Sequence, residues 1–170
     1  MEIFVKDMEF GRFLRKFPEF AAKVERMRSL LPGLHKTHLV DLVVMDCAPG
    51  KGTCRDVRWH VDGDPRRDNL YVLNVEGPNR TEFLAEPFDL PELPEGREEQ
   101  NRLLEDLLRG RVSLRIPEGE DRLYDSRTPH RGVVCDEHGR RTFLRLMATN
   151  YIKPKNIVRR GQDVPFRPAV

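Results

Sequence analysis

The sequence predicts a mainly β protein of the α+β class, in which short strands follow two N-terminal helices and flank one inserted helix. Two observations lead to this prediction. Apolar residues first recur at helical spacing, and after Gly33 they occur in short runs rich in β-branched residues. Gly and Pro separate these runs at intervals of about 8–12 residues, which is typical of a β-sandwich or jelly roll rather than a parallel α/β sheet.

The composition is that of one globular domain without a membrane span. The chain has 170 residues, of which 38% are hydrophobic and 34% charged, and its net charge of +2 provides no overall field for nucleic acid or membrane. No stretch approaches the roughly 18–20 apolar residues that cross a bilayer. Residues 1–7 carry acids and lack the apolar stretch of a signal peptide, so we expect a cytoplasmic protein. Three cysteines without CxxC spacing argue against a disulfide framework and a zinc knuckle.

The first third of the chain predicts two helices. Apolar side chains recur at i, i+3, i+4 and i+7 from Phe10, and this stripe is interrupted by Pro18. A second stripe runs from Ala21 to Leu31, where a Pro-Gly pair ends it. Because proline fits the first turn of a helix, Pro18 is expected to separate two helices whose apolar faces support a sheet.

Short apolar runs predict about eight strands and one further helix. The strands cover residues 38–45, 56–62, 69–75, 81–85, 111–116, 121–126, 130–134 and 142–150. The helix covers 98–109, where four leucines share one face and Gly110 follows as a stop. It overlaps an acidic insert, residues 86–106, which has eight acids and two arginines. This insert either favours a cationic substrate or is an ordinary solvated loop and helix, and the second interpretation is preferred.

We expect these elements to form one domain over residues 1–150, to which residues 1–33 contribute the supporting helices. Residues 151–170 form a basic tail with five Lys or Arg against one Asp. Such a tail is usually a solvated surface arm, and contact with nucleic acid is the less favoured alternative.

The segment around His60 and Asp62 carries the first candidate metal ligands. In a strand, residues i and i+2 project to the same face, so the predicted strand 56–62 places both side chains together. A third ligand from another strand would complete the two-histidine, one-carboxylate set of non-haem Fe(II) oxygenases, which leaves positions open for O₂ and substrate. An HxD pair alone is a weak signal, because a histidine beside an acid is usually just hydrogen bonded to it.

His130 and two arginines strengthen the hypothesis of a metal site. His130 begins a predicted strand 68 residues after Asp62. Arg141 and Arg145 follow this histidine by 11 and 15 residues and share strand parity with Phe143. If this face is buried, each guanidinium needs an anionic partner, and a carboxylate suits it. The alternative is that both arginines face solvent while the even-numbered residues pack inside; periodicity leaves the two open.

This combination of HxD, distal histidine and following arginines resembles the Fe(II)/2-oxoglutarate-dependent dioxygenase superfamily. Residues 123–132 (LYDSRTPHRG) are similar to the strand and turn that lead to that family's distal histidine, and the resemblance covers about residues 37–150. It implies a double-stranded β-helix, or jelly roll, with iron ligands His60, Asp62 and His130. It also makes Arg141 the expected anchor for the distal carboxylate of 2-oxoglutarate, with Arg145 as an alternative or second contact.

The resemblance further implies a reaction. O₂ and 2-oxoglutarate are converted to succinate and CO₂ while a substrate is oxidised, and Tyr71, Asn69 and Thr81 are candidates to hydrogen bond the cosubstrate. The acid at position 62, where halogenating relatives carry a small residue, favours hydroxylation of a C–H bond or a related oxidation. We expect a small-molecule substrate rather than nucleic acid, and no membrane partner. Both histidines must coordinate as neutral imidazoles, so metal affinity is expected to fall below their reference pKa of about 6.5.

A different class of function is also compatible with these residues. The protein could be a non-catalytic jelly-roll or cupin-like binding module in which His60, Asp62 and His130 hold no metal. A cupin-like metalloenzyme that does not use 2-oxoglutarate is less favoured, because cupins commonly offer more histidines and the arginine pair would then have no role.

Overall fold

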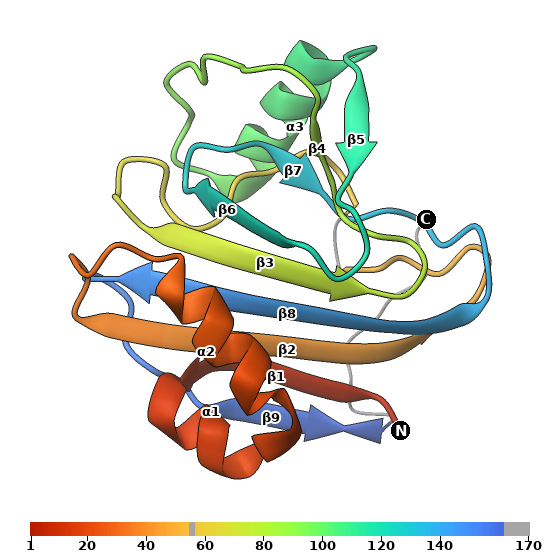
Figure 1. Ribbon diagram of the computed structural model, residues 1–170. Coiled ribbons are helices and arrows are strands. Elements are labelled where there is room, and N and C mark those ends of the chain that lie inside the picture. Colours follow the sequence, from red (N-terminus) through yellow and green to blue (C-terminus); the bar gives the residue numbers. More distant parts are fainter. Residues whose placement is uncertain (55–56, 162–170) are drawn as a thin grey trace.

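A computed structural model describes residues 1–54 and 57–161, which form two antiparallel β-sheets and few helices (Figure 1). The large sheet has six strands in the order β6-β3-β8-β2-β1-β9, and the small sheet has three in the order β5-β4-β7. The predicted mainly β class is therefore confirmed. The strands are β1 (Ile3–Glu9), β2 (Thr37–Cys47), β3 (Leu70–Glu76), β4 (Glu82–Leu84), β5 (Ser113–Arg115), β6 (Asp121–Asp125), β7 (His130–Arg131), β8 (Gly139–Thr149) and β9 (Ile157–Arg160).

Two helices cover one face of the large sheet, as the apolar stripes predict (Figure 1). They are α1 (Phe10–Lys16) and α2 (Ala21–Ser29), joined by the short 3-10 helix η1 (Pro18–Phe20). Glu9 caps α1, because its carboxylate accepts two backbone N–H groups of the first turn at 2.8 and 2.7 Å. Within the described ranges, every helix is too short or too polar to span a bilayer.

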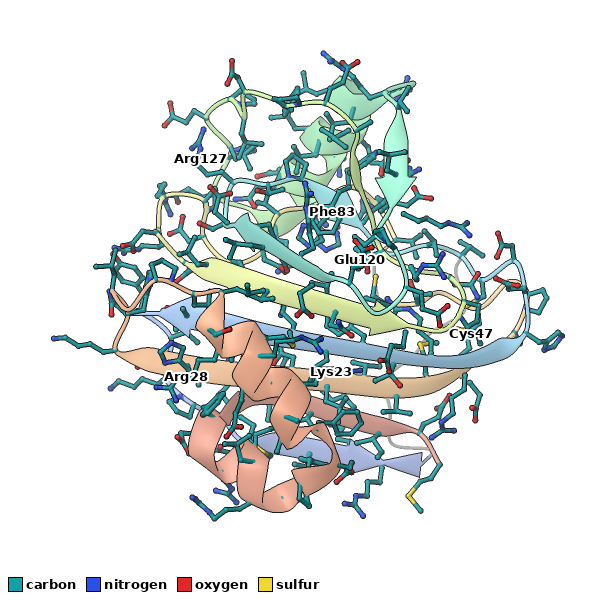
Figure 2. All side chains as sticks on the ribbon, viewed as in Figure 1. Lys23, Arg28, Cys47, Phe83, Glu120 and Arg127 are labelled. Carbon is teal, nitrogen blue, oxygen red and sulfur yellow. The ribbon has the colours of Figure 1, made fainter. Side chains whose placement is uncertain are left out.

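Strand β8 has buried residues on both of its faces. Its even-numbered residues 144–148 are apolar and pack in the core beneath the helices. Its odd-numbered residues, among them Arg141, Phe143 and Arg145, face the small sheet, from which Phe83 of β4 projects between the sheets (Figure 2). Because both faces are covered, the two arginines point inward while the even-numbered residues are also buried.

The inserted helix α3 (Arg97–Leu108) packs beside the small sheet (Figure 1). Its apolar stripe, represented by Leu104 and Leu108, contacts the buried indole of Trp59. The leucine face predicted for this helix therefore covers the chain segment that carries His60.

The predicted strand over residues 56–62 is wrong for the part that the structure describes. Position 56 lies outside the described residues, and 57–62 form only one antiparallel bridge, between His60 and His130. The partner strand β7 is two residues long, and at its N-terminal end Pro129 has no N–H group to extend the ladder.

Strands β1 and β9 were not predicted from the sequence. In β1 the period-2 pattern is broken by a bulge between Val5 and Met8, where Asp7 has a φ of 48°. Strand β9 lies in the expected basic tail and pairs with β1 at the sheet edge, so the sheet continues beyond residue 150. Its arginines are typical of an edge strand, because charge there discourages pairing with another chain. Residues 162–170 of the tail lie outside the described residues.

Candidate metal centre

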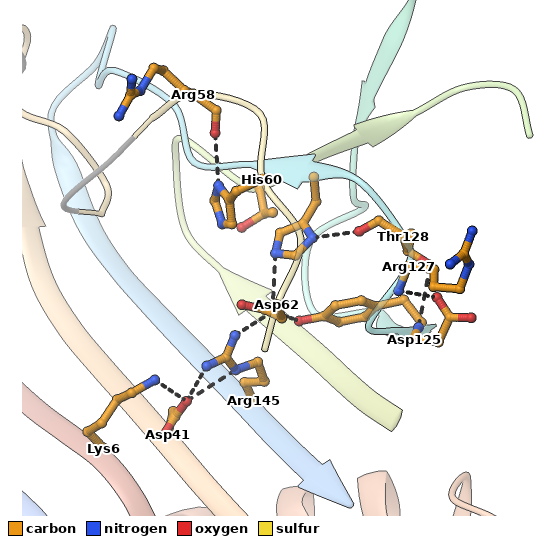
Figure 3. A network of polar contacts seen from close by, with 12 residues as sticks. Lys6, Asp41, Arg58, His60, Asp62, Asp125, Arg127, Thr128 and Arg145 are labelled. Atoms are coloured by element: carbon orange, nitrogen blue, oxygen red, sulfur yellow. Dashed lines mark hydrogen bonds and ion pairs between the residues drawn. The ribbon is translucent and has the colours of Figure 1, made fainter. Parts of the chain in front are cut away.

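The His60–His130 bridge brings together the candidate ligands from two distant segments. The N–H of each histidine donates to the carbonyl of the other at 2.9 Å, which places their rings 4.6 Å apart between centroids. Asp62 follows two residues later, and one ligand atom from each of the three side chains lies within 4.8 Å of the others (Figure 3). The three residues therefore converge although no strand runs through 57–62.

Backbone carbonyls fix both imidazole rings. Nδ1 of His60 lies 2.8 Å from the carbonyl oxygen of Arg58, and Nδ1 of His130 lies 3.0 Å from that of Thr128 (Figure 3). Because a carbonyl only accepts, each Nδ1 carries the hydrogen and each Nε2 of a neutral ring keeps its lone pair. Burial, followed by the neighbouring His130, lowers the pKa of His60 to about 4, so this ring is neutral at physiological pH.

Asp62 is a buried, ionised carboxylate. Burial raises its pKa, but the charge of Arg145 and the contact with His130 outweigh burial and hold the pKa well below the usual value. The Tyr124 hydroxyl donates to Oδ2 at 2.6 Å, and Nε2 of His130 lies 3.2 Å from the same oxygen. With His130 in its Nδ1–H form, two lone pairs face each other there, and a proton or a metal ion between them would relieve the repulsion.

Arg145 is held between two buried carboxylates. The register of β2 and β8 places Asp41 opposite Arg145, and Asp41 Oδ2 accepts from Nε at 3.1 Å. Nη1 of the same guanidinium pairs with Asp62 (Figure 3). Lys6 approaches Asp41 at 3.5 Å from the outer side. Arg145 therefore already has anionic partners.

Arg141 differs from Arg145 in that the hydrogen-bond partners the structure describes for it are neutral. It is 2% exposed, and it donates to the carbonyl of Asn79 at 3.0 Å and to the hydroxyl of Thr81 at 3.2 Å. Among the described residues it has no carboxylate within ion-pair distance, and burial lowers its pKa. Phe143 lies between the two guanidinium groups, 5.4 Å from that of Arg141 and 5.9 Å from that of Arg145. Within the part of the chain that the structure describes, Arg141 is thus a buried cation without an anionic partner.

Two further polar groups are buried in this region. The Tyr71 hydroxyl and Asn69 Oδ1 are buried and have no hydrogen-bond partner in the part of the chain that the structure describes. Burial and the charge of Asp62 raise the pKa of Tyr71, so its hydroxyl keeps the proton and can donate. The Tyr71 ring stacks on Tyr124 at 5.0 Å, with the Arg145 guanidinium 5.4 Å from its centroid.

Sequence reasoning did not single out Tyr124 and Asp41. Asp41 could have been found as an acid within an otherwise apolar strand. A buried acid seldom lacks a partner, so its position indicates a nearby cation. Tyr124 lies opposite Tyr71 in the register of β3 and β6, and its contact with Asp62 depends on a pairing between strands that local pattern does not reveal.

The low pKa of His60 predicts a pH-dependent stability. In the unfolded chain His60 takes up a proton near pH 6.5, whereas in the folded protein it stays neutral down to about pH 4. Between these values the unfolded chain binds more protons, so the free energy of unfolding of metal-free protein should fall by about 3 kcal/mol as the pH drops from 6.5 to 4. Urea unfolding at several pH values measures this change. His60→Asn should flatten it, and an equally steep fall in that variant would assign the effect to other groups.

No protein-family profile and no curated protein matches the chain. Two solved structures of EvdO2 from Micromonospora carbonacea var. aurantiaca are similar to it. The structure of EvdO2 complexed with 2-oxoglutarate is 19% identical over 85% of this chain and 66% of that chain, with a TM-score of 0.50. The second EvdO2 structure is 17% identical over 91% of this chain and 68% of that chain, with a TM-score of 0.47. The likeness to the first shows a shared fold, and this chain spans slightly less than two thirds of that protein's length.

Proposed function

We propose that the protein is a non-haem Fe(II)/2-oxoglutarate-dependent oxygenase that hydroxylates a C–H bond of a small molecule. The observation that carries this proposal is the arrangement of His60, Asp62 and His130, whose ligand atoms lie within 4.8 Å of one another. The adjacent face of β8 carries Arg141, a buried arginine that has no carboxylate partner among the described residues. We also propose that the two sheets correspond to the double-stranded β-helix of such enzymes. The fold shared with EvdO2, one structure of which is complexed with 2-oxoglutarate, agrees with this proposal.

The donor set fits ferrous iron. Two neutral imidazole nitrogens and one carboxylate are the ligands of the non-haem Fe(II) facial triad, which leaves three positions open. The Nδ1–H groups of His60 and His130 are already bound to carbonyls, so each ring can offer only Nε2. Asp62 is ionised by its surroundings and needs no proton loss on binding. His60, Asp62 and His130 would hold the metal.

Arg141 would anchor the distal carboxylate of 2-oxoglutarate. Its guanidinium is buried and has no anionic partner among residues 1–54 and 57–161, whereas Arg145 is paired with Asp41 and Asp62. A planar guanidinium binds a carboxylate through two parallel hydrogen bonds. The Tyr71 hydroxyl is a second donor without a partner in the described residues and could bind the same cosubstrate. Bound iron, 2-oxoglutarate and O₂ supply the oxidative decarboxylation that yields succinate, CO₂ and a hydroxylated product.

A non-catalytic binding module is the second candidate function, and the Asp62–Arg145 ion pair favours it. Arg145 and Tyr124 together satisfy Asp62 without any metal ion. In that case the polar network would serve only to join the two sheets, and the histidines would be ordinary buried residues.

Purified protein supplied with Fe(II), ascorbate and 2-oxoglutarate distinguishes the two functions. We expect slow iron-dependent formation of succinate even without the natural substrate, and an increase of the melting temperature when metal and 2-oxoglutarate are added together. Chelation of the metal should remove both effects. Absence of succinate formation and of stabilisation would favour the binding module.

A further inference from the structure

The segment that carries His60 is supported from outside the sheets. The backbone of residues 57–62 joins the small sheet through the reciprocal hydrogen bonds of His60 and His130, and the Arg131 guanidinium of β7 lies 4.7 Å from the Trp59 ring. On its other side the segment rests on α3, where the 2% exposed side chain of Trp59 packs against Leu104 and Leu108. Helix α3 therefore packs against the segment that carries the candidate metal ligand His60.

One peptide group connects α3 to the His60 ring. The carboxylate of Glu105 accepts the N–H of Trp59 at 2.7 Å. The carbonyl of the same peptide group, that of Arg58, accepts from Nδ1 of His60 at 2.8 Å. A trans peptide is planar, with its N–H and C=O pointing in opposite directions. Glu105 and His60 thus bind the two ends of a single rigid dipole.

We propose that Glu105 is a positioning residue for the metal ligand His60 and acts through the 58–59 peptide; this inference rests on the proposed metal site. Hydrogen bonds in series polarise one another. A charged acceptor on the N–H therefore makes the Arg58 carbonyl a stronger acceptor for the Nδ1–H of His60. The ring is held with Nε2 toward Asp62, and that nitrogen becomes a better donor to a metal. A carboxylate in direct contact with a metal-bound histidine raises the basicity of the ligating nitrogen in the same way. Here a peptide group lies between the carboxylate and the histidine.

His130 provides an internal comparison. Its Nδ1 also donates to the carbonyl two residues earlier, at Thr128. The next residue is Pro129, whose nitrogen carries no hydrogen, so no acid can bind the other end of that peptide. The His130 ring instead stacks on Phe83 at 5.3 Å between centroids. Glu105 should therefore affect His60 and leave His130 unchanged.

Three variants of the full chain test the proposal. Glu105→Leu removes the acceptor, Glu105→Gln keeps a side-chain carbonyl oxygen, and Asp106→Asn is a matched control on the exposed side of α3. Co(II) affinity is measured by titration calorimetry. We expect it to fall about 10–100-fold in Glu105→Leu, as for loss of other outer partners of metal ligands, and to change less than about threefold in the control and in Glu105→Gln.

The ring ¹⁵N chemical shifts of the metal-free proteins distinguish a specific effect on His60 from a general loss of structure, which would move the signals of both histidines. In Glu105→Leu we expect the His60 signals to move toward a mixture of tautomers while the His130 signals stay in place. Unchanged His60 signals and unchanged Co(II) affinity would overturn the proposal, and so would equal movement of both rings.

Two further outcomes are also informative. If Glu105→Leu does not fold, Glu105→Gln should still show a smaller shift of His60 alone, because an amide oxygen is a weaker acceptor than a carboxylate. No shift in that variant would overturn the proposal. A wild-type protein that binds no Co(II) would contradict the metal site itself, whereas the ring signals of metal-free protein still test the link from Glu105.

Discussion

Replacing His130 by glutamine is expected to abolish the visible absorption band that Fe(II) and 2-oxoglutarate should form with the wild-type protein under anaerobic conditions. Nε2 of His130 faces Asp62, so the substitution removes one of the three proposed protein ligands. The loss of Co(II) affinity should exceed the roughly 10–100-fold that loss of an outer partner costs. Visible spectroscopy and calorimetry measure the two effects.

His138→Gln is the matched control, because His138 is exposed in the turn before β8. It should leave the band and the Co(II) affinity unchanged. The His130 ring stacks on Phe83 and meets Tyr124 edge-on, so we expect some loss of stability in the first variant, and folding is checked by a thermal melt. A folded His130→Gln protein that keeps the band would show that the ligand set is wrong.

Arg141→Met is expected to weaken 2-oxoglutarate binding with little change in stability, whereas Arg145→Met is expected to lower the stability of the protein. Among the described residues Arg141 has no carboxylate partner, and the loss of its hydrogen bonds to Asn79 and Thr81 is offset by removal of a buried charge, so its replacement should change the free energy of unfolding by less than about 1 kcal/mol. The same substitution should weaken 2-oxoglutarate binding to the Co(II)-loaded protein about 10–100-fold, the value of a charge-assisted hydrogen bond. Arg145→Met leaves Asp41 and Asp62 buried without their shared cation and should cost about 3–5 kcal/mol of stability.

Urea unfolding and calorimetry on both variants separate these roles. A large loss of stability in Arg141→Met would mean that this residue is structural. If Arg145→Met keeps its stability and loses 2-oxoglutarate binding, the anchor is Arg145, and the arrangement proposed for Arg141 is contradicted.

Much of the fold follows from patterns that are local in the sequence. The stripes from Phe10 and Ala21 predict α1 and α2, and the leucines of residues 98–109 predict α3, because helical spacing of apolar residues is independent of what covers them. The long strands β2, β3 and β8 are also predicted from a local feature, namely runs of apolar and β-branched residues bounded by turn residues. Strand β1 was missed because its bulge at Asp7 shifts the alternation by one residue.

The candidate site could be predicted only in part. His60, Asp62 and His130 were identified by their spacing, and the structure brings them together by a single bridge and not by the strand expected over 56–62. The difference between Arg141 and Arg145 could not be predicted, since both lie on the same strand face. It depends on Asp41, which the register of β2 places opposite Arg145 alone.

Residue types and their spacing along the chain were sufficient to establish a mainly β class, the positions of the helices and the three side chains suited to a metal. Such properties depend on neighbours a few residues apart. Contacts between distant segments established that both arginines point inward, that one of them is already paired, and that an acidic helix supports His60. Pairing register and burial arise only when segments far apart in the chain meet, and these two features set the charge and orientation of every group in the site.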